Sequence, residues 1–316
     1  MAMLDSIIER AKAKRARVVF PESDSPNIHA AAQEIVRLGL AEVLLLPSEA
    51  LPDTFAQPGL SIVEPSTLLD QYAQHYLENR GKGSLATARR AITKPLYFGA
   101  MMVECGDADV MVAGIANPTR RVIQAAQLCI GPQDGVATPS SFFIMSFADR
   151  PPLVFADCAV NVDPNAEQLA DIAIASADSA EKLLGDKPKV ALLSFSSKGS
   201  ADHPKAKKVA AALQIIQTHR PDLEVDGELQ ADAALVESVA AQKLSEKGAV
   251  AGNANVLIFP DLDSGNIAYK LVQHLAKADA FGPILQGFAK PVADLSRGAS
   301  VEDVVAVTAA TIALSF

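Results

Sequence analysis

The chain has 316 residues, of which 49% are hydrophobic and only 5% aromatic, and its formal net charge is −9 at pH 7. This length and apolar content suit two packed domains with an aliphatic core. The acidic balance, without any Lys/Arg-rich run, excludes a nucleic-acid-binding surface, so an anionic ligand has to be bound by a few local cations.

No apolar stretch reaches the roughly 20 residues that a membrane-spanning helix needs. The N-terminal segment has only a short apolar stretch before its basic residues. We therefore expect a cytoplasmic protein with neither a membrane nor a nucleic acid as partner.

Cysteine and histidine spacing argues against a metal centre. Cys105, Cys129 and Cys158 are far apart among apolar neighbours, which indicates buried thiols rather than a disulfide framework. The five histidines show no HxxxH or HxH spacing. We expect no metal ligands and no permanently bound cofactor.

Apolar runs alternate with stretches of helical spacing along the chain, which predicts βαβ units with parallel strands. The runs predicted as buried strands are 17–21, 42–46, 110–115, 153–156, 190–195, 256–260 and 283–286. The predicted helices include 28–38, 166–184, 205–218, 232–244 and 267–276. The expected fold class is α/β, two-lobed, with mostly parallel sheets and flanking helices.

The predicted domain boundary lies near residue 135, where the sequence GPQDG at 131–135 interrupts the pattern. We expect domain I to comprise 1–134 plus 287–316 and domain II to comprise 135–286. The last stretch, 300–314, is predicted to be an amphipathic helix that returns to the first domain.

The segment 294–303, DLSRGASVED, places a hydroxyl, a guanidinium and free backbone amides just before that last helix. Such a helix start stabilises anions. Ser296 and Arg297 are therefore candidates to hold a phosphate or an oxyanion, and Asp303 is a candidate proton acceptor. The alternative is that Ser300 and Asp303 form only a helix-capping pair.

Polar residues follow two further predicted strands, where α/β proteins usually bind ligands. The sequence SFSSKGS at 194–200 offers Ser197, Lys198 and Gly199 as a phosphate-binding loop, and a solvated turn is the alternative. The sequence DLDSGNIAYK at 261–270 includes three further candidates, for which a turn with a helix cap is also a sufficient explanation. These three residues are Asn266, Tyr269 and Lys270.

The densest basic patch is RGKG at 80–83, followed by Arg89 and Arg90. Arg80 and Lys82 are candidates to bind a phosphorylated ligand. As a charge run, the patch is also explained as a solvated surface.

Taken together, these segments resemble the phosphate acetyltransferase (phosphate acetyl/butyryl transferase) family across essentially the whole chain. The resemblance implies two α/β lobes like those of isocitrate and isopropylmalate dehydrogenases, a site in the inter-lobe cleft, and a homodimer. It also implies reversible acetyl transfer between coenzyme A and phosphate by direct thiolate attack, with CoA as a substrate and no metal. The matching blocks include FGAMMVECGDADVMVAGI, ADCAVNVDPNAEQLADIAIASADSA, ANVLIFPDLDSGNIAYK and GPILQGFAKPVADLSRGASVEDVV.

By this resemblance the catalytic group is Ser296, Arg297 and Asp303. Asp303 takes the proton from the CoA thiol, Arg297 orients acetyl phosphate, and Ser296 hydrogen-bonds the reacting groups. Arg80 corresponds to an arginine of the family's basic segment, which is one residue shorter here.

The clearest departure from the family pattern lies at 114–124, GIANPTRRVIQ. Asn117 and Thr119 stand where a His-Thr-Thr type sequence is usual, and Gln124 replaces an arginine that contacts substrate. A neutral amide cannot make the bidentate contact of a guanidinium with phosphate. Arg120 or Arg121 either compensates or is an exposed helix charge.

Two alternative functions follow from this departure: a non-catalytic or regulatory CoA-ester-binding homologue, and a phosphate acyltransferase for propionyl or butyryl groups. A nicotinamide-dependent dehydrogenase is disfavoured because no GxGxxG follows a predicted strand.

Overall fold

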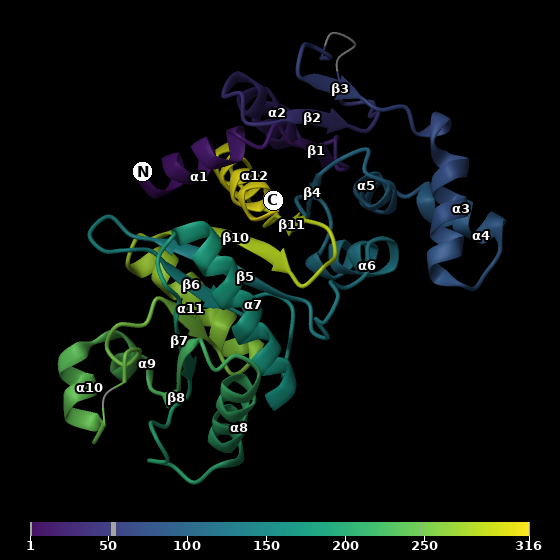
Figure 1. The fold of residues 1–316 in the computed structure, drawn as a ribbon. Helices are drawn as coiled ribbons and strands as arrows, with labels where there is room; N and C mark the ends of the chain where they lie inside the picture. The colour runs from purple at the N-terminus through teal and green to yellow at the C-terminus, as the bar shows by residue number, and fades with distance from the viewer. Residues whose placement is uncertain (1, 52–54, 247, 316) are drawn as a thin grey trace. The chain divides into compact units, whose positions relative to one another are not determined.

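The computed structural model describes residues 2–51, 55–246 and 248–315. The chain divides into two compact units, Met1–Asp134 with Gly282–Phe316 (unit 1) and Gly135–Phe281 (unit 2). Each unit combines a mostly parallel sheet with helices (Figure 1). The predicted fold class, α/β with mostly parallel strands, is therefore confirmed.

In unit 1 the strand order is β3-β2-β1-β4-β11-β10, and all neighbours are parallel except β10 and β11. Strand β10 starts in the last residues of unit 2 and continues into unit 1. The strands are β1 (Arg17–Phe20), β2 (Glu42–Leu45), β3 (Leu60–Ile62), β4 (Val110–Ala113), β10 (Asp279–Gln286) and β11 (Val292–Asp294).

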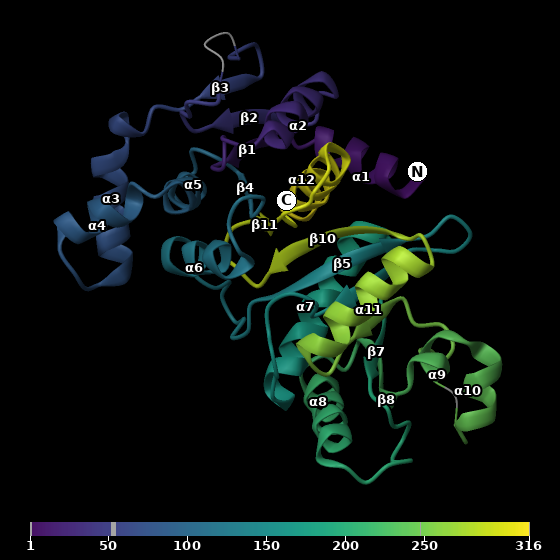
Figure 2. The same ribbon diagram turned by 180° about the vertical axis from the view of Figure 1, so that it is seen from behind.

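Helices pack on both faces of the unit 1 sheet. Helices α1, α2 and α12 pack together on one face and α5 and α6 on the other, as the front and rear views show (Figures 1 and 2). The helices are α1 (Ala2–Lys12), α2 (Pro26–Arg37), α3 (Leu69–Arg80), α4 (Leu85–Ile92), α5 (Pro95–Glu104), α6 (Thr119–Cys129) and α12 (Val301–Leu314), with a 3-10 turn at Pro65–Thr67.

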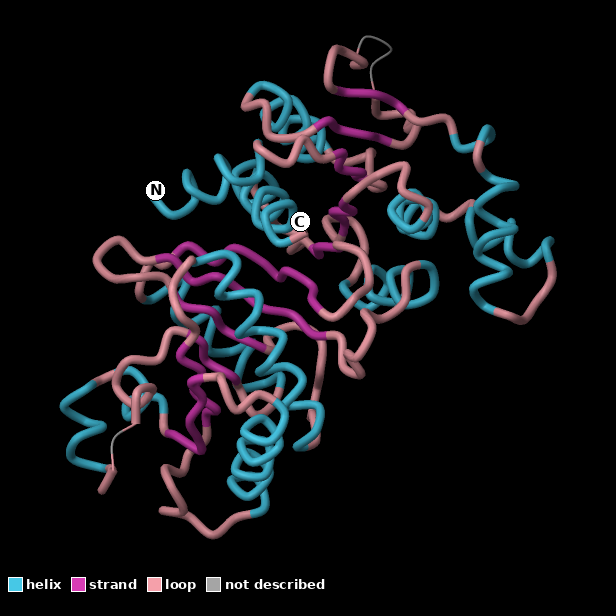
Figure 3. Tube along the Cα trace, in the orientation of Figure 1, coloured by secondary structure: helices cyan, strands magenta, loops and turns pink. Residues whose placement is uncertain are grey.

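In unit 2 the strand order is β5-β6-β9-β7-β8, and only β5 and β6 are antiparallel. The strands are β5 (Ser140–Ser146), β6 (Leu153–Ala156), β7 (Lys189–Leu193), β8 (Glu224–Leu229) and β9 (Val256–Ile258). The helices are α7 (Ala166–Leu184), α8 (Pro204–His219), α9 (Ala231–Leu235), α10 (Glu237–Lys243) and α11 (Leu262–Leu275). Figure 3 shows the alternation of strand and helix along both units.

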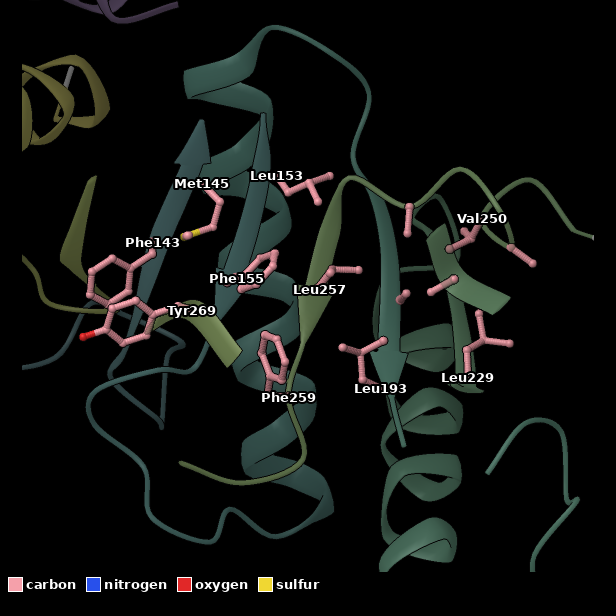
Figure 4. Close-up of a cluster of buried hydrophobic side chains, with 14 of the residues drawn as sticks. Phe143, Met145, Leu153, Phe155, Leu193, Leu229, Val250, Leu257, Phe259 and Tyr269 are labelled. Atoms are coloured by element: carbon pink, nitrogen blue, oxygen red, sulfur yellow. The ribbon is translucent and has the colours of Figure 1, made fainter. Parts of the chain in front are cut away.

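Strand burial explains why the apolar runs predict these elements. All residues of β4, β6 and β9 are buried, so both faces of each strand are covered, and the sequence reads as a continuous aliphatic run rather than an alternating one. In unit 2, Phe143, Phe155 and Leu257 belong to one apolar cluster (Figure 4).

Two predicted helices differ from the structure. The stretch 300–314 is not amphipathic, because Val304 to Ala313 are all buried where α12 packs against α1, α2, β4 and β11. The predicted helix 232–244 is two short helices, α9 and α10, because Val236 adopts an extended conformation between them. In the described part of the chain, no helix has the length and apolarity to cross a bilayer.

Candidate active site

The carboxyl ends of three parallel strands of unit 1 meet at one edge of the sheet. Strand β4 pairs in parallel with β1 on one side and with β11 on the other, and Asp294 lies in register with Ala113. Helices α2, α6 and α12 begin shortly after these strand ends. The first amides of a helix lack partners within that helix and carry partial positive charge, so this edge favours anions.

The buried carboxylate of Glu22, which follows β1, organises the loop after β4. Its Oε2 accepts hydrogen bonds from the backbone amides of Gly114 at 2.5 Å and Ile115 at 2.9 Å. Its Oε1 accepts from the amide of Ala116 at 3.1 Å and from Asn117 Nδ2 at 2.7 Å. Four donors satisfy both oxygens, and the loop that leads into α6 is thereby fixed.

Asp294, the last residue of β11, lies against this loop and is 1% exposed. Its Oδ2 accepts a hydrogen bond of 2.5 Å from the Thr119 hydroxyl, at the first residue of α6. Its Oδ1 is buried and has no hydrogen-bond partner among the described residues. Burial raises the pKa of Asp294 to about 7, with a further upward contribution from the charge of Glu22 and an opposing one from the Thr119 hydrogen bond.

A glycine is required at position 114, where the loop after β4 packs against the end of β11. Its φ is +112°, and a Cβ at this position would lie 2.2 Å from Asp294 Oδ1 and 2.6 Å from the backbone nitrogen of Leu295. The Leu295 amide donates to the Ala113 carbonyl at 2.7 Å. The β4 and β11 loops are therefore in contact through backbone atoms.

Ser296 and Arg297 are exposed in the turn between β11 and α12. The Ser296 hydroxyl accepts a hydrogen bond of 3.2 Å from the Gly298 amide, which leaves its own proton available for a ligand. Asn27, in the first turn of α2, donates to the Ala299 carbonyl at 2.9 Å and ties the turn to the neighbouring helix. The Arg297 guanidinium thus lies on a turn that is anchored at the carboxyl edge of the unit 1 sheet.

Asp303 forms the capping box that the sequence offered as an alternative. Its Oδ2 accepts from the Ser300 amide at 2.9 Å, and its own amide donates to Ser300 Oγ at 3.1 Å. In the part of the chain that the structure describes, its Oδ1 accepts no hydrogen bond. One oxygen caps the helix, and the other is free to accept a proton.

Gln124 is exposed on α6, beyond the first turn that Thr119 begins. Arg120 and Arg121 are also exposed, and Arg121 Nη1 contacts Asn117 Oδ1 at 3.4 Å. One of the two arginines therefore reaches back toward the loop that Glu22 holds.

Arg80 and Lys82 lie at the end of α3. The Arg80 guanidinium is half-buried, with its Cζ 5.8 Å from the ring centroid of Tyr76, whereas Lys82 is exposed. Gly81 ends the helix with a left-handed φ of +61°. The patch is an accessible cation pair in which one member is stacked on an aromatic ring.

In unit 2, the candidates Ser197, Lys198 and Gly199 are held by β8. Ser197 Oγ accepts from the Gln230 amide at 2.9 Å, and the Gly199 amide donates to Glu228 Oε1 at 2.7 Å. Lys198 forms an ion pair with Asp226. The three residues line a groove of about 760 Å³ together with 223–226 and 243–246.

The other three unit 2 candidates are on α11, and two of them contact the protein interior. Asn266 Nδ2 donates to the Cys158 carbonyl at 3.0 Å. Tyr269 is 9% exposed and stacks on Phe143 with ring centroids 4.0 Å apart (Figure 4). Lys270 is exposed, with its Nζ 4.9 Å from the Tyr269 ring centroid. Asn266 and Tyr269 therefore have structural partners of their own.

Among the described residues, no three or more His, Cys, Asp or Glu side chains form a cluster that could hold a metal ion. The three cysteines are free thiols. Cys129 and Cys158 are buried, and burial raises the pKa of both thiols above the ordinary value. Cys105 is half-buried, and burial raises its pKa to about 11. All three are therefore protonated near neutral pH.

Comparison with known proteins decides the family. Residues 2–312 match the family model described as phosphate acetyl/butaryl transferase. The chain belongs to this family. A phosphate acetyltransferase of Acetivibrio thermocellus is 45% identical to it over 324 residues, which cover 98% of this chain and 97% of that protein.

Solved structures agree with this family assignment. A phosphotransacetylase from Streptococcus pyogenes superposes with a TM-score of 0.92 at 38% identity, covering 99% of this chain and 97% of that one. A 4-hydroxythreonine-4-phosphate dehydrogenase from Klebsiella pneumoniae has a TM-score of 0.54 at 11% identity, over 95% and 99% of the two chains. The second likeness concerns the fold alone and is consistent with the dehydrogenase-like architecture predicted from the sequence.

Two residues at the candidate site of this transferase family member were not identified from the sequence. Glu22 follows the first strand in the sequence PES, and Asp294 begins the segment that supplied Ser296 and Arg297. Their position in the sequence could have indicated them, because an acidic residue at or directly after the end of a buried strand lies at the carboxyl edge of the sheet. The partners of both acids are 92 or more residues away in the sequence, which no local pattern indicates.

Proposed function

We propose that this protein is a phosphate acetyltransferase, which transfers acetyl reversibly between coenzyme A and inorganic phosphate. The observation that carries the proposal is the family match over residues 2–312, together with a curated phosphate acetyltransferase that is 45% identical over 98% of the chain. The anion-favouring edge of unit 1, with exposed Ser296 and Arg297, supplies a chemistry that fits.

In the direction of acetyl-CoA synthesis, the CoA thiol loses its proton and the thiolate attacks the carbonyl carbon of acetyl phosphate. The C–S bond forms, the C–O bond to phosphate breaks, and phosphate leaves with the electron pair. Asp303 Oδ1, which is free of the helix cap, is the proposed proton acceptor. Arg297 and the Ser296 proton stabilise the charge that develops on the carbonyl and phosphate oxygens.

The remaining candidates are proposed as binding residues. Arg80 and Lys82 are accessible cations for the phosphates of CoA. The loop with Ser197, Lys198 and Gly199 borders a groove in unit 2. Among the α11 candidates, exposed Lys270 is available to a ligand, while Asn266 and Tyr269 shape the helix that carries it.

A homodimer is part of the proposal, supported by an exposed apolar stripe on α11. Ile267, Leu271 and Leu275 are 56%, 52% and 79% exposed. Because they are four residues apart, they lie on one face of the helix. Large exposed apolar patches commonly mark interfaces. Light scattering tests this: the wild type should have twice the mass of one chain, and Leu271→Glu should lower it.

The test of function is the formation of acetyl-CoA by the purified protein from acetyl phosphate and CoA, alongside propionyl and butyryl phosphate. Fastest turnover with acetyl phosphate is expected. Fastest turnover with a longer acyl phosphate would instead assign a propionyl or butyryl transferase. Tight CoA binding without turnover of any of the three would overturn the proposal and favour a CoA-ester-binding protein. Cell fractionation tests the cytoplasmic location, which stays a prediction.

A further inference from the structure

Buried carboxylates occur at several strand ends of this protein, and most accept two or more hydrogen bonds. Glu22 accepts four. Asp157, after β6, accepts from the Ser141 hydroxyl, from the amides of 159–161 and from the Asn161 side chain. Glu228 accepts from Ser196 Oγ at 2.8 Å and from the Gly199 amide. Each of these carboxylates is therefore held in place by two or more donors.

Asp294 is the exception among them. One donor, the Thr119 hydroxyl, serves its Oδ2, and its buried Oδ1 has no partner in the described residues. The Gly114 backbone lies directly against Oδ1, since a Cβ there would come within 2.2 Å. An ionised carboxylate in this position is poorly solvated, and the neutral acid is favoured.

The charged groups around Asp294 do not replace the missing donors. Glu22, from the loop after β1, adds negative charge, which raises the pKa of Asp294. Arg120 and Arg121 on α6 and Arg297 on the following turn are exposed. Glu302 and Asp303, at the start of α12, are acidic. Among these charged groups, Glu22 is therefore the one that shifts the pKa of Asp294, and its negative charge favours the protonated acid.

The protonation state of Asp294 affects the hydroxyl of Thr119. This hydroxyl has one proton and is half-buried at the N-terminus of α6. When Asp294 is ionised, this proton is donated to Oδ2, and the hydroxyl offers a ligand only lone pairs. When Oδ2 carries a proton, Thr119 accepts it and can turn its own proton toward a ligand. An anion at this helix start is bound better by a donor than by an acceptor.

We infer that Asp294 is a positioning residue for phosphate binding, and that its protonation sets whether the Thr119 hydroxyl donates to the bound phosphate group. Phosphate binding is then coupled to uptake of a proton at Asp294. The inference rests on the proposed function only in naming phosphate as the ligand.

The direct test is calorimetry of inorganic phosphate binding to the full chain in two buffers of different ionisation enthalpy, near pH 8. Wild type should take up more protons per bound phosphate than Asp294→Asn, by a difference of up to about one proton. The amide is nearly isosteric and cannot titrate. Glu302→Gln, at an exposed carboxyl of α12, is the matched control and should take up as many protons as wild type. Equal uptake by wild type and Asp294→Asn would overturn the inference.

Thr119 provides a second test that does not depend on the fold of the Asp294 variant. Thr119→Val removes the hydroxyl at nearly constant shape, whereas Thr119→Ser keeps it. We expect the valine variant to lose the proton coupling and to bind phosphate about tenfold more weakly. The serine variant should recover the coupling. Coupling that survives in the valine variant contradicts the inference.

Steady-state kinetics adds a readout that a purely structural role would not move. The phosphate KM of wild type should rise relative to that of Asp294→Asn as pH increases, while the KM for acetyl-CoA changes in parallel in both. The ratio at each pH cancels the titration of phosphate itself. Because calorimetry needs no turnover, an inactive wild type that still shows coupled phosphate binding would refute the proposed function and leave the inference standing.

Discussion

Ser300 and Asp303 hydrogen-bond each other reciprocally, with the Ser300 amide 2.9 Å from Asp303 Oδ2 and the Asp303 amide 3.1 Å from Ser300 Oγ. The capping role and the proposed catalytic role of Asp303 therefore coexist in one side chain. Two substitutions separate the roles.

Asp303→Asn keeps an oxygen that can accept from the Ser300 amide but cannot take a proton from the CoA thiol. We expect its melting temperature to stay close to that of wild type, while kcat falls by about 100-fold or more. Asp303→Ala should lose the cap as well, at a cost of about 1 kcal/mol in the free energy of unfolding. A fully active asparagine variant would leave Asp303 with a capping role alone.

Arg297→Ala should lower kcat/KM for acetyl phosphate by roughly 100-fold or more, because a guanidinium that stabilises developing charge is lost. Its side chain is exposed, so the thermal unfolding midpoint should not change. Arg37→Ala, at an exposed arginine paired with Glu34, is the matched control for loss of one surface cation. Equal activity of both variants would remove Arg297 from the site.

Gln124→Arg should lower the phosphate KM several-fold, because it restores the guanidinium that the family resemblance implies at this position. Gln124 is exposed on α6, so the larger side chain should be tolerated. Kinetics with varied phosphate measures the effect. An unchanged KM, combined with a raised KM in Arg120→Ala or Arg121→Ala, would show that a neighbouring arginine already supplies the charge.

Asp294→Asn should change how stability depends on pH. The pKa of Asp294 is about 7 in the folded protein, above the usual value near 3.9 of an unfolded chain. Between these values the unfolded state binds fewer protons, so this group lowers the free energy of unfolding as pH rises, by a few kcal/mol on the order of the pKa difference. Denaturant titrations should show the variant gaining stability relative to wild type from about pH 4 to about pH 7. A difference that is constant with pH contradicts the raised pKa.

Gly114→Ala should destabilise the protein much more than Gly131→Ala. Both glycines have positive φ, of +112° and +82°. The added Cβ at Gly114 would overlap Asp294 Oδ1, whereas nothing lies within 4 Å at Gly131. We expect a loss of about 1 kcal/mol at Gly131 and about 3 kcal/mol or more at Gly114 in chemical unfolding. Equal losses would show that the Asp294 side chain and the Leu295 backbone move away without cost.

Much of the fold was readable from local patterns. Runs such as 110–115 and 256–260 predicted β4 and β9, because parallel strands covered on both faces need continuous aliphatic residues. Strand β8 was not predicted, because its sequence EVDGEL mixes charges into a partly buried strand. Helix α12 was predicted as a helix, but its complete burial depends on packing partners from distant parts of unit 1.

The sequence by itself determined the α/β class and the helix start at which Ser296, Arg297 and Asp303 gather, because these depend on spacing within about ten residues. It also determined the family resemblance, through matching blocks along the whole chain. Only the tertiary structure decided that Glu22 holds the loop after β4 and that Thr119 donates to Asp294, 175 residues away. The physical reason is the order of parallel strands, since β1, β4 and β11 are distant in the chain but end side by side at one edge of the sheet.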